Sequence, residues 1–423
     1  MPRKMIVGGR LFDGRESHYQ DGAAILLEDG LIAAVGRRAD FGQATGVELV
    51  DASGLYVLPG LVNAHVHLTF MYSVGNVDQN ISKSAPDCTI HAVRVAALLL
   101  SQGITTARDM AGTNNVPLLI RDAIEDGRIP GPRLLVCNQP VAISGGHAWH
   151  FCTIADGPDA FRAAARQQLQ LGADFIKVMA SHDPWPMPGS EQTRAELTVE
   201  EMAAAFEVAH AWGRRTGCHV MGSSAIDRVI RAGVDIIEHG QYLTRSLAKD
   251  MAERGVCFTP TMSSYDVQTM HPRFDRGLPW KLAHEPLIEP HREALRFALE
   301  EGVKIVNGTD SVGCYAEEID IFRRTGMSAA DSLLSCTRWP AEALGVADSV
   351  GTLEVGKRGD LVLLREDPLA DPYALEAVEL VFKDGRAHRP KDLTYAEHIT
   401  KPEWDMRALA QHAIPLEGAS IVG

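Results

Sequence analysis

Two histidines separated by a single residue, His65 and His67, end the apolar stretch LPGLVNAHVHL. Side chains at positions i and i+2 of a β-strand point to the same face, so a strand here directs both imidazoles to one side. Burial of two polar rings without partners costs several kcal/mol, whereas a divalent cation binds neutral imidazole nitrogens. A lone histidine in such a strand is usually a core residue that bonds to a backbone carbonyl. The pair therefore predicts a metal site.

Four more apolar segments later in the chain each carry a polar side chain. These side chains are Lys177 in DFIKVM, His219 in GCHVMG, His239 in DIIEHG and Asp310 in NGTDS. Imidazoles and carboxylates are common ligands of divalent metals. For Lys177, a side chain that snorkels from a strand end is the simplest alternative explanation. We expect these four side chains to meet the two histidines at one end of a sheet.

The central part of the chain has the pattern of a closed α/β barrel. Between residues 59 and 349, eight short apolar segments alternate with helical stretches, and Gly or Ala-Gly often closes a helix. Strands that alternate with crossover helices form a parallel sheet, and eight such units predict a (β/α)8 TIM barrel. Active sites of such barrels lie at the carboxyl ends of the strands, where the six polar side chains are expected. One final helix is expected over residues 328–345.

The two flanks of the barrel have a different texture, which predicts a small β-sandwich module. Residues 1–58 and 350–390 contain short β-type runs separated by turns, some of them with Asp-Gly, a strong local signal for a β-hairpin. We expect these two segments to form one module built from both ends of the chain. Residues 391–423 form a polar C-terminal tail, for which an oligomer arm and a loose end both stay open.

The polar residues of the barrel resemble the binuclear metal centre of the amidohydrolase superfamily. That centre has an H-x-H pair on strand 1, a lysine on strand 4, histidines on strands 5 and 6, and an aspartate on strand 8. The resemblance covers nearly the whole chain, including the split β module and the segment GTLEVGKRGDLVLL that returns to it. Within the superfamily, the sequence is most similar to the imidazolonepropionase-related dipeptidases and carboxypeptidases. That group includes enzymes that cleave Xaa-Pro dipeptides and is related to fungal ochratoxinase.

The resemblance implies two divalent metal ions with six protein ligands. The ligands are His65, His67, Lys177, His219, His239 and Asp310. The first two histidines and the aspartate would bind the more buried ion, and the other two histidines would bind the more exposed one. Lys177 would bridge both ions as its carbamate, because a bare ammonium beside two dications is unfavourable and a carbamate is an anionic, bidentate bridge. Imidazolonepropionase uses one metal without this lysine, so Lys177 argues against that activity.

Zinc is the expected metal because of its availability, although this ligand set also suits Mn, Co and Fe. Two metals about 3.5–4 Å apart share a hydroxide and provide a nucleophile at neutral pH. Asp310, beside the bridging hydroxide, would accept its proton and deliver it to the leaving nitrogen as general acid and base. The expected reaction is therefore hydrolysis of a peptide or amide bond.

Two residues outside the ligand set are candidates for contact with the substrate. In the similar dipeptidases the histidine of a Gly-Gly-His motif meets the substrate, which points to His147 in SGGHAWHF rather than His150. We expect His147 to bind the carboxylate or the carbonyl of the substrate. Tyr242, three residues after His239, is placed to hydrogen-bond the developing oxyanion, with ordinary packing as the alternative.

The resemblance favours small dipeptides with a hydrophobic residue before a C-terminal proline as substrates. N-acyl amino acids, ochratoxin-like amides, carbamates and ureas are the alternatives. A different class of hypothesis is a non-catalytic scaffold that retained the barrel after its metal centre decayed. Such proteins usually lose ligands, and this sequence has all six, so an enzyme is favoured.

The composition narrows the partners and the compartment. The chain has 41 Lys and Arg against 55 Asp and Glu, a formal net charge of −14, and no basic stripe, which argues against a nucleic-acid partner. Its seven cysteines are isolated and form no C-x-x-C pair, as expected in a reducing compartment. No apolar run approaches the ~20 residues that a membrane span needs. We expect a cytoplasmic protein with no membrane partner, and the resemblance implies a homo-oligomer.

Overall fold

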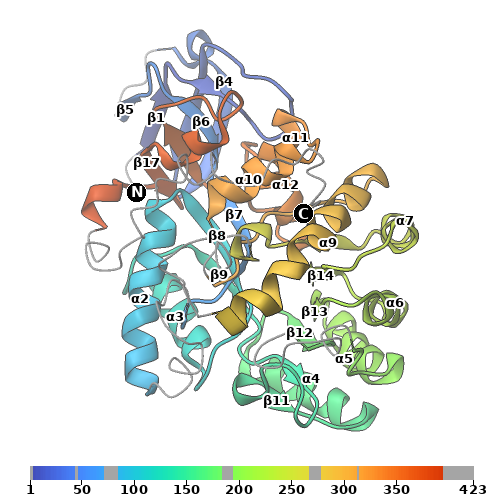
Figure 1. Cartoon of the computed structure of the whole chain (residues 1–423). Helices are drawn as coiled ribbons and strands as arrows, with labels where there is room; N and C mark the ends of the chain where they lie inside the picture. Colours follow the sequence, from blue (N-terminus) through green and yellow to red (C-terminus); the bar gives the residue numbers. More distant parts are fainter. Residues whose placement is uncertain are drawn as a thin grey trace.

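The computed structural model describes residues 3–42, 46–70, 84–182, 194–265, 278–311 and 314–393 of the 423-residue chain. Through the middle of the chain, strands alternate with helices, and the strands of the two chain ends lie together beside this central part (Figure 1). Of the expected C-terminal tail, residues 394–423 lie outside the described parts. The predicted domain boundaries stay predictions.

The β module consists of two sheets. The first has the order β4-β3-β1-β5, with strands β1 (Arg3–Val7), β3 (Ala23–Glu28), β4 (Leu31–Arg37) and β5 (Val47–Asp51). The second has the order β18-β17-β16-β6-β2, with strands β2 (Arg10–Leu11), β6 (Tyr56–Pro59), β16 (Leu361–Leu364), β17 (Val378–Lys383) and β18 (Arg386–His388). Strands β6 and β16 are paired antiparallel, so the second sheet joins the two ends of the sequence. Ile25, Val57 and Leu363 belong to one apolar core shared by both sheets.

Two Asp-Gly turns close the hairpins of this module, as the sequence predicts. Asp29 and Gly30 have φ values of 49° and 84°, and Asp384 and Gly385 have φ values of 48° and 70°. Positive φ at both central residues is the type I′ geometry that suits the twist of a hairpin. The turns also touch each other, because a Cβ atom on Gly385 would lie 3.1 Å from the Cα atom of Gly30. Glycine is therefore required by conformation and by space.

The barrel strands are parallel to one another. They are β7 (Leu61–Val66), β8 (Ile104–Asp109), β9 (Arg133–Val136), β10 (Val141–Ala142), β12 (Ile176–Met179), β13 (Thr216–Val220), β14 (Ile236–His239) and β15 (Cys257–Thr259). Strands β9 and β10 are successive parts of the third barrel strand, and the short β11 (Thr153–Ile154) pairs with β10. Residues 305–310 provide the eighth segment: the amide of Val306 bonds to Phe258 of β15, and the amide of Thr309 bonds to His65 of β7.

Helices follow the strands and surround them on the outside (Figure 1). They are α2 (Ala85–Ser101), α3 (Val116–Glu125), α4 (Pro158–Leu171), α5 (Val199–Ala211), α6 (Ser223–Ala232), α7 (Arg245–Arg254), α9 (Leu278–Glu300) and α10 (Tyr315–Arg324). Glycines at positions 172, 233 and 255 end α4, α6 and α7 with positive φ, as predicted for helix C-caps. The predicted α/β fold, a TIM barrel with a flanking β module, is confirmed.

The expectation of one final helix over residues 328–345 is wrong, because the segment forms two short helices. These are α11 (Ala329–Leu334) and α12 (Arg338–Ala343), separated at Thr337, whose φ and ψ are −134° and −89°. Pro340 has no N–H to bond to the carbonyl of Cys336, so a continuous helix would be interrupted here. The carbonyl of Cys336 instead accepts a bond of 2.9 Å from the amide of Val62 on β7. The break thus fastens this segment to the first barrel strand.

No helix in the described part of the chain is both long and apolar enough to pass through a membrane.

Asp235, just before β14, ties the amino end of this strand to its neighbours. Its carboxylate accepts bonds of 2.8–2.9 Å from His210 of α5, from Arg215, and from the amide and hydroxyl of Thr216. Burial alone would raise the pKa of Asp235, but these donors outweigh burial and lower it. The contribution of the carboxylate to stability is therefore present above the unfolded pKa of ~3.9 and is lost as the pH falls through the lower folded pKa.

We predict that Asp235→Asn lowers the free energy of unfolding at pH 7 by about 1–3 kcal/mol, because four donors lose a charged acceptor. Urea unfolding of both proteins measures this difference, which should shrink as the pH is lowered toward about 3. A difference that grows on acidification would contradict the assignment.

Candidate functional site

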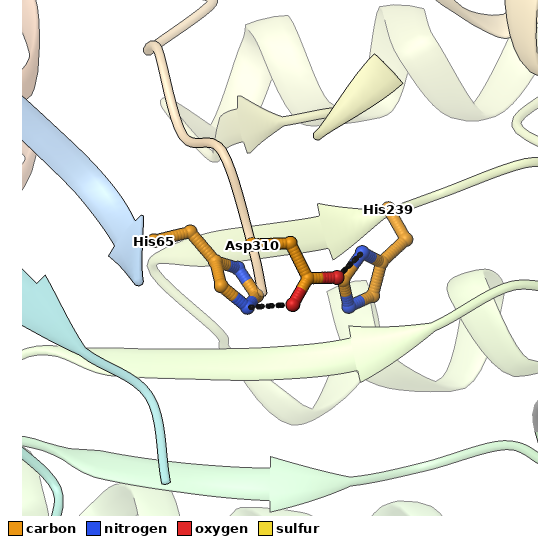
Figure 2. A group of neighbouring side chains, drawn as sticks. All are labelled: His65, His239 and Asp310. Carbon is orange, nitrogen blue, oxygen red and sulfur yellow. Dashed lines mark ion pairs between the residues drawn. The ribbon is translucent and has the colours of Figure 1, made fainter. Parts of the chain in front are cut away.

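The six side chains predicted as ligands lie at the carboxyl ends of the barrel strands. His65 is on β7 and His67 follows it, Lys177 is on β12, His219 on β13, His239 ends β14, and Asp310 ends the eighth segment. The histidines and the lysine are at most 5% exposed. Figure 2 shows side chains from three of these segments pointing toward one another. Their assignment as ligands stays a prediction.

Three acceptor atoms converge where β7 meets the eighth segment. The Nε2 atoms of His65 and His67 are 3.3 Å apart, and Oδ1 of Asp310 lies 3.8 Å and 3.3 Å from them. The other ring nitrogen of each histidine is already engaged, by Glu238 at 2.9 Å and by the carbonyl of Ala111 at 3.4 Å. Neutral rings that donate from Nδ1 carry a lone pair on Nε2. Three such acceptors repel one another unless a cation or a proton lies among them.

His239 meets the same aspartate from the other side. Its Nδ1 lies 4.0 Å from Oδ2 of Asp310, and one ligating atom each from His65, His239 and Asp310 fall within 4.8 Å of one another (Figure 2). Nδ1 also bonds to the hydroxyl of Thr261 at 2.7 Å, an interaction that fixes the orientation of the ring. Asp310 is therefore shared between two groups of imidazoles.

The backbone at this site is strained. His239, Thr261 and Asp310 have φ values of 71°, 55° and 53°, in the left-handed region that side-chain-bearing residues rarely adopt. Each such residue costs on the order of 1–3 kcal/mol, and such conformations cluster at functional sites. The strain turns the three side chains from the strand ends toward the same space.

The environment keeps the imidazoles neutral. Burial is the largest cause that holds the pKa values of His65, His67, His219 and His239 below their ordinary value. Burial alone would raise the pKa of Asp310, but a proton shared with His67 and the positive charge of the surrounding groups, Lys177 among them, outweigh burial and lower it. Neutral imidazoles and an ionised carboxylate are the forms that bind divalent cations.

The buried groups around the site fit a metal centre. Nε2 of His219 is buried without a hydrogen-bond partner, which a metal ion would supply. Lys177 is 2% exposed and forms no ion pair with a described residue. A buried ammonium without a counter-ion is costly, and its carbamate would bring the anionic charge that two cations need. The donor set on this side therefore suits the predicted second ion and its bridge.

Sequence reasoning missed a buried ion pair beneath the site. Glu238 accepts a bond of 2.9 Å from Nδ1 of His65 and one of 2.5 Å from Arg108, whose Nε donates to the carbonyl of Ala64 at 2.6 Å. Both side chains are at most 1% exposed, and burial raises the pKa of Glu238. Glu238 thereby fixes the tautomer of His65. The sequence signal for this ion pair was that Arg108 and Glu238 are charged residues in otherwise apolar strand segments, TTARDM and DIIEHG.

The candidate His147 lies over the fifth barrel strand. Its ring stacks on the ring of His219, with centroids 4.2 Å apart and planes 9° apart. It therefore reaches the site beside a predicted ligand. The alternative, His150, instead packs edge-on against Phe151 at 4.9 Å. The geometry favours His147 of the two as a substrate contact.

Tyr242 lies farther along the same rim. It is half-buried and packs against the apolar cluster of Met221, Tyr265 and Leu287, and Tyr265 lies 5.8 Å from His239. Burial raises the pKa of Tyr242, so its hydroxyl keeps its proton. That hydroxyl has no hydrogen-bond partner among the described residues. It is therefore available as a donor, although no contact with the ligand set fixes its role.

Comparison with known proteins identifies the class. Residues 56–387 match the Amidohydrolase family, and the chain belongs to this family. Its members are hydrolases that act on amide and other C–N bonds and are generally metal-dependent. The prediction of an amidohydrolase is confirmed.

Individual members of the family are similar over nearly the whole chain. Ochratoxinase from Aspergillus niger is 27% identical over 425 residues, with 90% of this chain and 86% of the relative covered. A Xaa-Pro dipeptidase with methionine bound in its active site has a TM-score of 0.84 and 28% identity, covering 92% of this chain and all of the other. A prolidase complexed with N-methylphosphonate-L-proline has a TM-score of 0.84 and 25% identity, covering 92% and 99%.

We predict that Glu238→Gln weakens metal affinity by about 10–100-fold, because the ring of His65 loses its charged acceptor. Competition with a chromogenic chelator measures this affinity. The matched control is Glu342→Gln, which removes a surface carboxylate paired with Lys304 at 2.6 Å and should leave metal binding unchanged. Equal affinities in the two variants would exclude a role for Glu238.

Proposed function

We propose that this amidohydrolase is a binuclear metallopeptidase that cleaves dipeptides, with a hydrophobic residue before a C-terminal proline as the preferred substrate. The observation that carries the proposal is the set of three acceptor atoms, 3.3–3.8 Å apart, on His65, His67 and Asp310. These atoms, with His219, His239 and carboxylated Lys177, would hold two divalent ions, for which zinc is the expected metal.

Bound divalent ions of this kind polarise a carbonyl and lower the pKa of water, so that hydroxide is available at neutral pH. The contribution of the chain is to hold the acceptors in fixed positions. Glu238 and Thr261 orient two of the imidazoles through their Nδ1 atoms. Because the rings are neutral and buried, little reorganisation accompanies the reaction.

Asp310 is the proposed general acid and base. Its two carboxylate oxygens face different imidazoles, Oδ1 toward His67 at 3.3 Å and Oδ2 toward His239 at 4.0 Å. It is the one proposed ligand with a substantially exposed side chain, at 16%, and so can reach a substrate atom. It would take up the proton of the attacking water and pass it to the amide nitrogen, which leaves poorly unless protonated.

The proposed substrate contacts lie on the β13 and β14 side of the site. His147, stacked on His219, would bind the carboxylate or carbonyl of the dipeptide. Tyr242 would donate its hydroxyl proton to the developing oxyanion. The apolar cluster of Met221, Tyr265 and Leu287 beside Tyr242 would accept a hydrophobic side chain.

The similarity to a Xaa-Pro dipeptidase and to a prolidase, at 28% and 25% identity, supports the dipeptide substrate. Ochratoxinase, at 27% identity, favours the second candidate, an amide that links an amino acid to an acyl group. A homo-oligomeric assembly and a cytoplasmic location also remain proposals.

A substrate panel tests the function. We predict that kcat/KM for Xaa-Pro dipeptides with a hydrophobic first residue exceeds that for N-acyl amino acids, carbamates and ureas by about tenfold or more, equivalent to about 1.4 kcal/mol. Release of proline and of the other products measures the rates. Chelation should abolish them and zinc should restore them. Faster cleavage of N-acyl amino acids would replace the dipeptide by the second candidate.

Asp310→Asn tests the acid–base role. We predict that kcat falls by about 10²–10⁴-fold, because an amide cannot carry the proton. The matched control is Asp235→Asn, which changes a carboxylate at the opposite end of the barrel and should keep the turnover per folded molecule. Retention of more than about a tenth of wild-type kcat, below the effect usual for such a group, would remove Asp310 from the chemistry.

A further inference from the structure

His291, on α9, is a buried histidine outside the predicted ligand set. It is 1% exposed, and its ring meets the ring of Tyr265 edge-on, with centroids 5.4 Å apart. The ring of Tyr265 lies in turn 5.8 Å from that of His239. A buried polar ring is normally hydrogen-bonded, so the partners of His291 indicate what it does.

One ring nitrogen of His291 binds two backbone carbonyls. The ring donates to the carbonyl oxygens of His239 and Pro260. Nε2 has no hydrogen-bond partner among the described residues, so the donor is Nδ1. Burial is the largest cause that lowers the pKa of His291, to about 4, and the ring is therefore neutral. A neutral imidazole has a single N–H, which the two oxygens share.

The two carbonyls lie just past the end of a strand pairing. Glu238 of β14 and Thr259 of β15 are the last paired residues of these strands. His239 and Pro260 come next, and a proline has no N–H with which to continue the ladder. The N–H of His291 thus joins the two strands at the point where the ladder between them stops.

Both strands turn into a left-handed conformation here. His239 has a φ of 71°, and Thr261, which follows Pro260, has a φ of 55°. Such conformations cost on the order of 1–3 kcal/mol each and persist only where the surrounding contacts hold them. The N–H of His291 provides such contacts, because it fixes the peptide group after His239 and the peptide group before Thr261.

Glu318 of α10 fixes Thr261 from the other side. Its carboxylate accepts a bond of 2.9 Å from the amide of Met262 and one of 2.7 Å from the amide of Ser263. Glu318 is fully buried. The hydroxyl of Thr261 bonds to Nδ1 of His239 at 2.7 Å. Two outer helices therefore determine where this hydroxyl lies.

We propose that His291 is a positioning residue for the metal ligand predicted at His239. By tying the carbonyls of His239 and Pro260 to one N–H, it keeps the hydroxyl of Thr261 against the imidazole and directs that ring toward the more exposed ion. The inference rests on the two-ion centre of the proposed function. The affinity for one ion then depends on a helix residue that touches neither ion.

Two variants of equal shape test this role. Asn and Leu branch at the same atom, but only the amide of Asn has N–H groups, at the position of Nδ1. Competition with a chromogenic chelator, on the metal-free full chain in bicarbonate buffer, gives the two zinc dissociation constants. In His291→Leu one constant should rise about tenfold, the low end for residues that orient a ligand, and the other less than about twofold. His291→Asn should keep both within about threefold of wild type.

Thr261→Val tests the same contact without a change on α9. Valine keeps the branched shape and lacks the hydroxyl, so the same zinc constant should rise about tenfold or more. Combined with His291→Leu, the loss of binding free energy should be less than the sum of the single losses, because both residues act on one imidazole.

The matched control is His210→Leu. His210 is also a histidine on an outer helix, but it bonds to Asp235 at 2.9 Å, at the opposite end of the barrel. This variant should change neither zinc constant by more than about twofold, as expected for distant sites.

Equal zinc constants in His291→Leu and His291→Asn, equal weakening of both ions, or additive losses in the double variant would each overturn the proposal. A wild-type constant in Thr261→Val overturns it even if His291→Leu does not fold. Dipeptide hydrolysis is measured separately. The expected difference between the Leu and Asn variants, in an enzyme that cleaves no dipeptide, keeps the role of His291 and removes the dipeptide substrate. Dipeptide cleavage without that difference does the reverse.

Discussion

The mutual repulsion of electron lone pairs inside an apolar barrel is the constraint on which this structure depends. Nε2 of His65, Nε2 of His67 and Oδ1 of Asp310 face one another across 3.3–3.8 Å, although none of them has a proton to give in its favoured form. Such an arrangement is stable only when positive charge is shared among the three atoms. The end of the barrel therefore suits a cation, in agreement with membership of a family that is generally metal-dependent.

Two buried glutamates, Glu238 and Glu196, each hold histidines in position on a different side of the site. Glu238 lies beneath the metal-binding side, where Arg108 compensates its charge and the ring of His65 is fixed. Glu196 lies at the loops, where the ring of His182 and the backbone of His147 compensate its charge. Both carboxylates act on imidazoles through hydrogen bonds. Glu238 lies beside the predicted ligands, and Glu196 holds the backbone of His147, the proposed substrate contact.

Much of the fold follows from local rules. The i, i+2 geometry of strands places His65 and His67 on one face, and the Asp-Gly turns fix both hairpins of the β module. Strand ends were found because apolar runs stop at polar residues such as His239. The break at Thr337 was missed because the helical pattern of the sequence continues through it. Its explanation is a long-range contact, since the carbonyl of Cys336 accepts a hydrogen bond from Val62 of β7 instead of from a residue of its own helix.

The supporting residues could not be derived in the same way. Arg108 and Glu238 come from strands distant in the sequence, and their pairing depends on how the barrel closes. Glu196 lies in a connecting segment whose path no periodicity determines. A polar residue in a loop is usually solvated, so nothing local distinguished it. The roles of these side chains depend on which residues lie next to them in the folded structure, and the sequence alone does not give those neighbours.

The pairing of β6 with β16 has a consequence for synthesis in the cell. Val57 of β6 lies opposite Leu363, so the partner of this early strand emerges from the ribosome only after the whole barrel has been translated. Until then the nascent chain exposes the unpaired edge of β6, a template for wrong strand pairing. The time between the synthesis of β6 and that of β16 is thus a period in which this topology is open to mispairing.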